Sequence, residues 1–366
     1  MNHTQFDLFD FMPAEEAEAF KAQKSDDWKW TFADYPQEKN GLKVFSCFAC
    51  GGGSTMGYKL AGCEVLGCCE IDPKMNEVYV ANHHPKHNFL MDIREFNNIP
   101  NEDLPEELFH LDILDGSPPC TTFSMAGQRE ESWGKKKKFR EGQAEQTLDD
   151  LSFIFIETVA KLKPRCVIME NVEGLLLGNA WGYVQKIYQQ FHDAGYQVGH
   201  WLCKGENMGI PQTRHRVFFI ALRNDVQFDL DRLDMAFNYE PVLYGTIKSV
   251  EEKIANGKMA NAIRQRLPGE KIEDVMIRLH GVRSGITHRI ATIDAVYPTQ
   301  TAGHADIWTE HGNHPSDADV IHAQTFPEDY DFGSAKVEYI CGMSVPPVMI
   351  KRIVQRMLES GVFQWT

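Results

Sequence analysis

The sequence has no apolar run long enough to cross a membrane. A transmembrane helix needs about 18 uninterrupted apolar residues, and no stretch of this sequence approaches that length. The N-terminus, MNHTQFDLFDFMPAEE, has no basic region followed by an apolar one, which is the pattern of a signal peptide. We therefore expect a cytoplasmic protein that makes no contact with a membrane.

Positive charge is also scarce. The 366 residues include 37 Lys and Arg against 52 Asp and Glu, which gives a net charge of −15. This net charge excludes a histone-like protein that coats nucleic acid by bulk charge. It does not exclude a protein that binds nucleic acid through one local basic face. Hydrophobic residues at 43% and charged residues at 24% are ordinary for a globular protein, and the length predicts about two domains.

Disulfide cross-links are not expected either. Nine cysteines are an odd number in a chain without a signal sequence, which predicts reduced thiols. A functional cysteine is then catalytic or metal-bound rather than cross-linked. The Cys47-x-x-Cys50 pair lacks the four ligands of a structural zinc site, so we predict no metal.

From residue 42 onward, short apolar runs alternate with helical patterns. The sequence predicts strands at residues 42–48, 64–69, 111–114, 166–169 and 217–222, and helices at 55–61, 75–82, 151–162 and 345–358. This βαβα order predicts an α/β fold with a parallel sheet covered by helices on both faces. The rhythm weakens between about residues 224 and 298, which predicts a separate, smaller domain.

Ligands of open parallel sheets bind beyond the carboxyl ends of the strands, so the residues that follow each strand are candidates for a site. A glycine-rich turn, residues 48–54, follows the first strand. It lacks the last glycine of a dinucleotide fingerprint, because position 56 is Met56, and it is also compatible with a simple strand–helix turn. Glu70 follows the second strand, where a carboxylate binds ribose hydroxyls, and Asp92 follows a third apolar run, where it could accept from an adenine amino group. Together they favour an adenosine-containing cofactor.

A candidate nucleophile follows the next strand. Two prolines precede Cys120 and fix the backbone at the rim of the sheet, whereas a cysteine that only fills the core, such as Cys166, lies inside a strand. We interpret Cys120 as a thiolate nucleophile. Glu170 ends the neighbouring strand and is either its acid–base partner or a solvated carboxylate.

Three polar residues lead into the last strand. Alternation along an extended chain places Gln212, Arg214 and Arg216 on one face. Two arginines on one face suit a phosphate or a carbonyl acceptor, and the alternative is a solvated strand face.

These segments, in this order, resemble the DNA (cytosine-5) methyltransferases of bacteria and phages. The resemblance runs from about Leu42 to the C-terminus and is carried by the following segments: Phe48-x-x-Gly51-Gly52-Gly53, Glu70, Asp92, Pro119-Cys120, Phe123-Ser124, Glu170-Asn171-Val172, Gln212-x-Arg214-x-Arg216, Pro298-Thr299-x-Thr301, Gln324-Thr325-Phe326-Pro327 and Gly342-Met343-Ser344-Val345. Three positions depart from the family pattern. Cys50 replaces a glycine of the cofactor turn, Met343 replaces an asparagine, and Ala318-Asp319 replaces an Arg-Glu pair.

The resemblance implies a Rossmann-like fold that uses S-adenosylmethionine, with a small target-recognition domain. It implies an N-terminal extension over residues 1–40, a catalytic domain over 41–223, a recognition domain over 224–330 and a returning segment over 331–366. The implied cofactor site consists of Phe48, Gly51, Gly52, Gly53, Glu70, Ile71, Asp92, Ile93, Pro119 and Ser344.

The resemblance also implies a mechanism. Cys120 adds to C6 of a cytosine flipped out of duplex DNA, Glu170 stabilises the charge through N3 and N4, and Arg216 binds O2 with support from Arg214. Cys50 and Met343 touch the expected cofactor site and could weaken the affinity for the cofactor.

The expected DNA contacts follow Cys120. Residues 125–147 predict a basic lid that binds phosphates, and the alternative is a solvated basic loop. The expected DNA-binding residues are Ser124, Arg129, Lys135, Lys136, Lys137, Lys138 and Gln212. Residues 246–304 contain nine Lys and Arg against six Asp and Glu, a local charge of +3 that favours a DNA-facing segment.

Other functions stay open from the sequence. The rivals are an RNA (tRNA) cytosine-5 methyltransferase, a non-catalytic DNA-binding relative and a Rossmann oxidoreductase, the last disfavoured by Met56. Separately, Gln5-Phe6-Asp7-Leu8-Phe9 resembles the short peptide that binds the bacterial sliding clamp, where Leu8 and Phe9 would fill an apolar pocket. The alternative is a tail folded on its own domain.

Overall fold

The structure is a computed structural model that describes residues 22–119, 151–177, 180–267, 270–283, 288–302 and 306–365. Several residues singled out in the sequence lie outside these ranges: Cys120, Ser124, Arg129, Lys135–Lys138 and the segment Gln5–Phe9. Within the described residues, no helix is both long and apolar enough to span a membrane.

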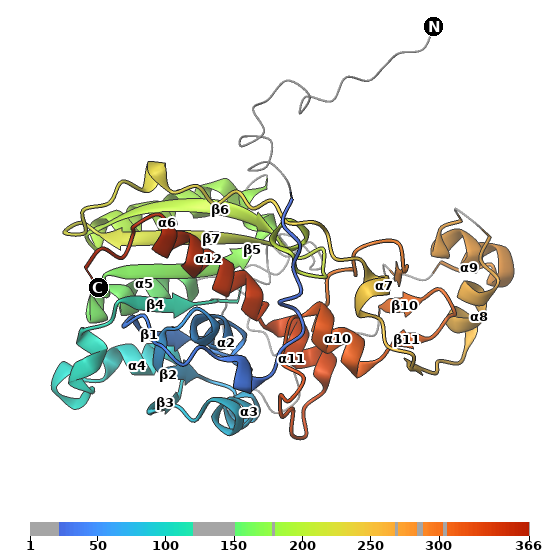
Figure 1. The fold of residues 1–366 in the computed structure, drawn as a ribbon, viewed down its shortest axis with the longest axis horizontal. Helices are drawn as coiled ribbons and strands as arrows, with labels where there is room; N and C mark the ends of the chain where they lie inside the picture. Colours follow the sequence, from blue (N-terminus) through green and yellow to red (C-terminus); the bar gives the residue numbers. More distant parts are fainter. Residues whose placement is uncertain are drawn as a thin grey trace, which may run out of the picture.

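A seven-stranded sheet forms the centre of the larger of two units (Figure 1). Its strands, in the order β3-β2-β1-β4-β5-β7-β6, are β3 His87–Leu90, β2 Glu64–Glu70, β1 Lys43–Cys47, β4 Ile113–Gly116, β5 Cys166–Val172, β7 His215–Arg223 and β6 Tyr196–Lys204. The predicted α/β fold is confirmed. The predicted parallel pairing holds for β3, β2, β1, β4 and β5, but not for β7, which runs antiparallel to both β5 and β6.

The reversal of β7 has a local cause and a consequence for the site. Only residues 205–214 separate β6 from β7, and so short a connection joins antiparallel strands. As a result, the start of β7 lies beside the end of β5, with Arg216 paired to Val172. Residues that enter β7 therefore reach the same sheet edge as residues that leave the parallel strands.

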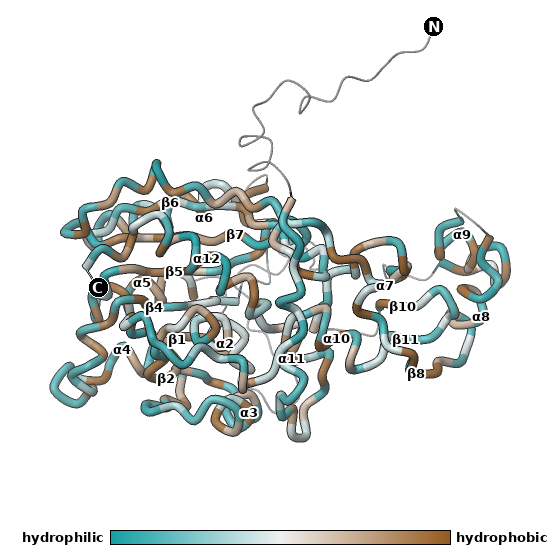
Figure 2. The backbone as a smooth tube through the Cα atoms, viewed as in Figure 1, coloured by the Kyte–Doolittle hydropathy of each residue, from teal (hydrophilic) through white to brown (hydrophobic). Residues whose placement is uncertain are grey.

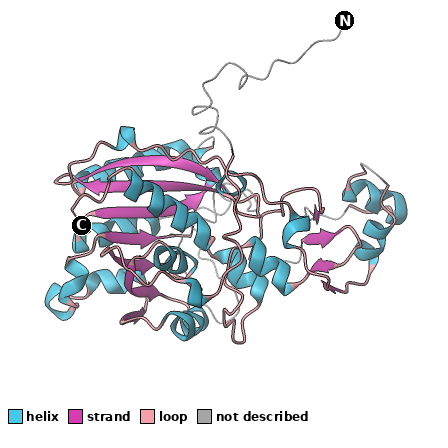
Figure 3. Ribbon diagram, viewed as in Figure 1, coloured by secondary structure: helices cyan, strands magenta, loops and turns pink. Residues whose placement is uncertain are grey.

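Helices cover both faces of the sheet (Figure 3). On one face, α4 Ile93–Asn98, α5 Leu151–Leu162 and α6 Trp181–Asp193 pack in a cluster that includes Phe45, Met169 and Phe219. On the other face, α2 Gly53–Leu60 and α12 Pro347–Glu359 pack in a cluster that includes Ile113 and Phe218. The helix α3 Pro73–His83 contacts β2 and β3.

The smaller unit consists of short elements. They are α7 Tyr244–Ile247, β8 Glu252–Lys253, α8 Lys258–Arg264, α9 Ile272–His280, β9 Arg289–Ala291, β10 Ile307–Thr309 and β11 His314–Pro315. A separate cluster that includes Ile263, Val275 and Trp308 forms its core, and hydrophobic stretches run through both units in Figure 2. The chain then returns through α10 Asp317–Ala323 and α11 Val337–Met343.

The boundary expected at residue 224 differs from the point where the chain leaves the large unit. Leu230, Leu233 and Met235 are buried in the same cluster as Phe218, so the chain stays on the large unit for more than ten residues beyond the expected boundary. The apolar residues of this stretch are irregularly spaced, and the sequence pattern therefore gave no sign of their burial.

The part of the N-terminal extension that the structure describes lies against the returning segments. The indole Nε1 of Trp30 donates to the carbonyl of Thr325 at 2.8 Å, and Asp27 pairs with Arg352 of α12 at 2.6 Å. Residues 22–40 therefore connect the segment after α10 with the last helix.

Candidate functional site

A pocket lies beyond the carboxyl ends of β1 to β4, where the strand order reverses, as expected for an open α/β sheet. Its volume is about 750 Å³, including the solvent at its mouth. Six of the residues expected to bind the cofactor line it: Phe48, Glu70, Ile71, Asp92, Ile93 and Pro119. Further lining residues, among them Asp72 and Tyr339, come from positions that the motifs did not include. Met343 is one of the three departures from the family pattern, and the structure places it in this pocket.

Glu70 is a buried carboxyl that is partly satisfied by the backbone. Its two oxygens accept from the amide of Cys50 at 2.7 Å and from the amide of Asp72 at 2.8 Å. Burial raises the pKa of Glu70, against the effect of these hydrogen bonds. A carboxylate has about four acceptor positions, so two remain for hydroxyl groups of a ligand.

Asp92 has two tasks at the other side of the pocket. Its side chain caps α4 by accepting from the amide of Arg94 at 2.8 Å, and it pairs with the Arg94 guanidinium at 3.2 Å. Because the cap fixes the carboxylate at the pocket wall, it is held ready for a donor such as an amino group.

The glycine-rich turn is packed closely against the returning C-terminal segment. Gly52 has φ +82°, and a Cβ built on it would lie 2.0 Å from the His83 ring. A Cβ on Gly53 would lie 2.2 Å from the Val345 carbonyl. Gly51 and Ser344 lie behind the turn rather than at the pocket wall, with Ser344 buried and its carbonyl bound to Gln324.

Cys50, which also lines the pocket, has φ +46°. A residue with a Cβ is strained in this left-handed region by about 1–2 kcal/mol, which explains why glycine is usual there. Burial, followed by the Glu70 charge, raises the pKa of the Cys50 thiol to about 12. The thiol is therefore neutral and behaves as a small apolar group in the pocket wall.

Glu170 and Arg216 form an ion pair at the same end of the sheet, where β5 ends and β7 begins. The Arg216 Nε lies 2.7 Å from Glu170 Oε1, and both side chains are largely buried. Arg216 also donates to the carbonyl of His215 at 2.7 Å. The imidazole of His215 in turn lies between two carboxylates, 3.2 Å from Glu173 and 2.8 Å from Glu206, which the sequence analysis did not identify. The start of β7 is thus held firmly at the site.

Arg214 is placed differently from Arg216. It is buried, and its guanidinium donates to the carbonyls of Gln300 at 3.1 Å and Gly342 at 3.2 Å. Burial and the Arg216 charge lower the pKa of Arg214. Arg214 therefore ties the stretch between β9 and β10 to the end of α11, and any support it gives Arg216 is indirect.

Gln212, for which we expect a DNA contact, is fully buried. Its amide nitrogen donates to Ala323 at 3.0 Å and Gln324 at 2.8 Å, and its amide oxygen accepts from the amide of Gln300 at 2.8 Å. In this arrangement the side chain joins Gln300, between β9 and β10, to the end of α10, and it is not accessible to a ligand.

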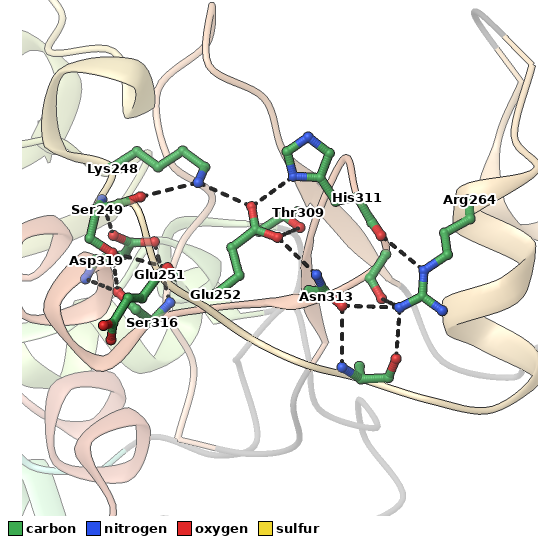
Figure 4. A network of polar contacts seen from close by, with 12 residues as sticks. Lys248, Ser249, Glu251, Glu252, Arg264, Thr309, His311, Asn313, Ser316 and Asp319 are labelled. Carbon is green, nitrogen blue, oxygen red and sulfur yellow. Dashed lines mark hydrogen bonds and ion pairs between the residues drawn. The ribbon is translucent and has the colours of Figure 1, made fainter.

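A polar network centred on Glu252 holds the base of the small unit (Figure 4). Its carboxylate binds His311 at 2.9 Å, Asn313 at 3.0 Å, Lys248 at 3.0 Å and Thr309 at 3.1 Å. Burial alone raises the pKa of Glu252, but these hydrogen bonds outweigh it and lower the pKa to about 2.

Much of the positive charge in this unit is paired with carboxylates of the unit itself or of the returning helices α10 and α11. Five of its nine basic residues pair with carboxylates: Lys248, Lys253, Arg278, Arg283 and Arg289. The local excess of +3 is therefore a weaker indication of a DNA-facing surface than it is in the sequence alone. Within the described residues, no group of three His, Cys, Asp or Glu side chains is arranged to hold a metal ion.

Comparison with known proteins shows which protein family the chain matches. The model of the C-5 cytosine-specific DNA methylase family matches residues 42–359. The chain is 32% identical to the type II methyltransferase M.NgoPII of Neisseria gonorrhoeae over 52% of this chain and 51% of that protein, so it spans about half the length of this relative. It is 25% identical to M1.HphI of Haemophilus parahaemolyticus over 87% of each protein.

Solved structures agree on the fold. A putative DNA modification methyltransferase encoded within an E. coli prophage has a TM-score of 0.61 and 18% identity, over 87% of this chain and 99% of that one. The likeness at this identity concerns the fold alone, whereas the family model covers most of the chain. The chain therefore belongs to the C-5 cytosine-specific DNA methylase family.

Proposed function

We propose that this chain transfers a methyl group from S-adenosylmethionine to C5 of a cytosine in a specific sequence of duplex DNA. One observation carries the proposal: the Glu170–Arg216 pair lies at the same sheet edge as the pocket. The exit of β4, between them, leads through Pro119 directly to Cys120.

The pocket fits the cofactor that this family implies. S-adenosylmethionine supplies a methyl group on a positively charged sulfur. Glu70 would accept from the ribose hydroxyls with its two remaining acceptor positions, and Asp92 from the adenine amino group. Phe48, Ile71 and Ile93 offer apolar surface for the adenine ring, and the two carboxylates favour a cationic ligand.

The chemistry needs a nucleophile because C5 of cytosine is itself a poor one. The base leaves the helical stack at a cost of a few kcal/mol. The Cys120 thiolate then adds to C6, and the electron pair of the C5–C6 bond becomes available at C5. A protonated Glu170 donates to N3 and Arg216 donates to O2, so both stabilise the negative charge that develops on the ring. After C5 has accepted the methyl group, loss of the C5 proton expels the thiolate.

The DNA contacts proposed for Ser124, Arg129 and Lys135–Lys138 remain predictions, since these residues lie outside the described ranges. Basic side chains there would bind phosphates beside the flipped base. The proposed clamp contact through Gln5–Phe9 also remains a prediction, because that segment lies outside the described ranges. A clamp pull-down that is unchanged by Leu8→Ala together with Phe9→Ala would refute it.

The proposal is tested by offering labelled S-adenosylmethionine with either unmodified duplex DNA or tRNA, followed by nucleoside analysis of the product. We expect label in 5-methylcytosine from DNA and none in tRNA. Label in tRNA alone would establish the RNA methyltransferase instead. A folded protein that binds DNA but labels neither polymer would establish a non-catalytic relative.

A further inference from the structure

The turn after β1 contains two residues with side chains in a backbone conformation that favours glycine. Phe48 has φ +57° and Cys50 has φ +46°. Phe48 is fixed by the sheet, because its amide donates to the Cys69 carbonyl at 2.9 Å. Cys50 lies at the pocket wall, beyond the end of β1, so contacts outside the strand ladder must hold its strained conformation.

On its N-terminal side, Cys50 is anchored to Glu70. The Cys50 amide donates to the Glu70 carboxyl at 2.7 Å, and this is the carboxyl that we expect to bind the ribose hydroxyls. The side chain of Cys50 also lines the pocket. A change in the conformation of Cys50 would therefore move the amide away from Glu70 and reshape the pocket wall at the same time.

On the C-terminal side, two buried rings anchor the next residue. The Gly51 carbonyl accepts from the Tyr330 hydroxyl at 2.5 Å and lies 3.1 Å from Nε2 of His83. Tyr330 is 6% exposed and His83 is 5% exposed, so water does not compete for this carbonyl. Burial lowers the pKa of His83 to about 3, so its ring is neutral near pH 7 and has one N–H. Because the carbonyl oxygen can only accept, that proton lies on Nε2.

The Tyr330 hydroxyl is held in place by its surroundings. Its ring packs against Phe326 and Phe332, with ring centroids 4.9 Å and 4.7 Å apart. A Cβ built on Gly51 would lie 2.9 Å from the Tyr330 hydroxyl and 2.6 Å from Cγ2 of Ile340. Glycine at position 51 therefore allows the hydroxyl to approach, and the returning segment supports the cofactor turn from behind.

We propose that Tyr330, assisted by His83, is a positioning residue of the cofactor pocket, whose hydrogen bond to the Gly51 carbonyl holds Cys50 in the left-handed conformation. The inference rests on the proposed function, in which this pocket holds S-adenosylmethionine. Neither ring is among the described residues that line the pocket, so both act through the backbone of the turn. With glycine in place of Cys50, the left-handed conformation is free of this strain, and the hydrogen bond then contributes less to the pocket.

The test is a double-mutant cycle read in the binding of S-adenosylmethionine, measured by calorimetry without DNA. Tyr330→Phe removes the hydroxyl and keeps the ring. We expect it to raise the dissociation constant about five- to tenfold in the chain with Cys50, because fewer molecules then have the turn in the conformation that binds. In the Cys50→Gly background the same substitution should raise the dissociation constant less than about twofold. Any contact of the Cys50 thiol with the cofactor cancels in this comparison.

Tyr35→Phe is the matched control. Tyr35 packs against the same hydrophobic cluster as Tyr330, and its hydroxyl has no hydrogen-bond partner among the described residues. The dissociation constant should stay within about twofold of the wild-type value. A second readout separates positioning from general packing: Tyr330→Phe should raise KM for S-adenosylmethionine and leave kcat at saturating cofactor nearly unchanged.

The outcomes distinguish the inference from the proposed function. A rise that is as large in the Cys50→Gly background as with Cys50, no rise in either, or an equal rise for Tyr35→Phe overturns the inference and leaves the proposed function intact. If Tyr330→Phe does not fold, His83→Leu is measured in both backgrounds: a smaller rise with Cys50 alone supports the inference, and equal effects overturn it. A wild type that does not bind S-adenosylmethionine overturns the proposed function and the inference with it.

Discussion

Asp115, in β4, is 1% exposed, and its oxygens accept from the Ser46 hydroxyl at 2.6 Å and from the Tyr58 hydroxyl at 3.0 Å. This buried carboxyl makes a prediction about stability that is independent of any activity. Burial raises the pKa of Asp115 from its ordinary value of 3.8 to about 7 in the folded chain, so the folded state binds its proton more tightly than the unfolded state does. The contribution of this group to the free energy of unfolding therefore decreases as the pH rises from about 4 to about 7, and it is constant above that pH. Replacing Asp115 by Asn abolishes this dependence.

The magnitude follows from the two pKa values. Proton linkage gives a loss of about 2.5 kcal/mol between pH 5 and pH 8 for the wild type through this group. All other titrating groups are common to the wild type and Asp115→Asn, so they cancel in the difference between the two proteins. We expect the free energy of unfolding of Asp115→Asn, relative to the wild type, to increase by about 2.5 kcal/mol between these pH values.

Urea unfolding at pH 5 and pH 8 measures this difference. The comparison does not require the variant to be more stable at either pH, since altered hydrogen bonds to Ser46 and Tyr58 shift both values equally. A difference between the two proteins that stays constant within about 0.5 kcal/mol would contradict this prediction, because Asp115 would then be ionised in the folded chain at both pH values.

Three more predictions follow from the site and its supports. Glu170→Gln should lower the rate of methyl transfer at least about a hundredfold in a single-turnover assay, with cofactor binding unchanged in calorimetry, because it removes the proton donor but not the pocket. Gln212→Ala should lower the free energy of unfolding by about 2–4 kcal/mol in urea titrations, because it leaves the buried partners of this side chain unsatisfied; a loss below about 0.5 kcal/mol would contradict the assigned role. Glu252→Gln should lower the free energy of unfolding by about 2 kcal/mol above pH 4.5, because the hydrogen bonds of Glu252 stabilise the fold while its carboxyl is ionised. The difference from the wild type should disappear as the pH falls towards 2. Equal losses of stability at pH 2 and pH 7 would count against the Glu252 network.

Much of the large unit could be predicted from the sequence because its signals are local. The strands β1, β2 and β5 are nearly continuous apolar runs, as expected for strands that are buried on both faces. The residues after each strand could then be assigned to one sheet edge, which brought Phe48, Glu70 and Asp92 to a common pocket. The family resemblance added Ile71, Ile93 and Pro119 to the same pocket.

Pairing between distant segments could not be predicted in the same way. The direction of β7 depends on its short connection to β6, and β6 itself has a half-buried mixed pattern that resembles a loop in the sequence. Alternation correctly groups Gln212, Arg214 and Arg216 along the chain, but it cannot distinguish a ligand from the protein's own carbonyls as their partner. Only Arg216 lies beside Glu170, whereas the other two bind backbone groups near the small unit.

Asp115 shows a further limit of sequence patterns. It follows an apolar run and precedes the Pro-Pro-Cys segment, and nothing local distinguishes it from a solvated carboxylate at the end of a strand. Its burial depends on Ser46 and Tyr58, which come from segments more than 50 residues away. Such a group becomes visible only when the strands are placed side by side.

The most direct test of the account is methyl transfer from labelled S-adenosylmethionine to unmodified duplex DNA by the wild type and by Cys120→Ser. The covalent mechanism predicts that the wild type produces 5-methylcytosine, while the variant binds cofactor and DNA normally but transfers label only at background level. A variant that retains the wild-type rate would contradict the central role of Cys120, because a serine hydroxyl is a far weaker nucleophile at neutral pH than a thiolate.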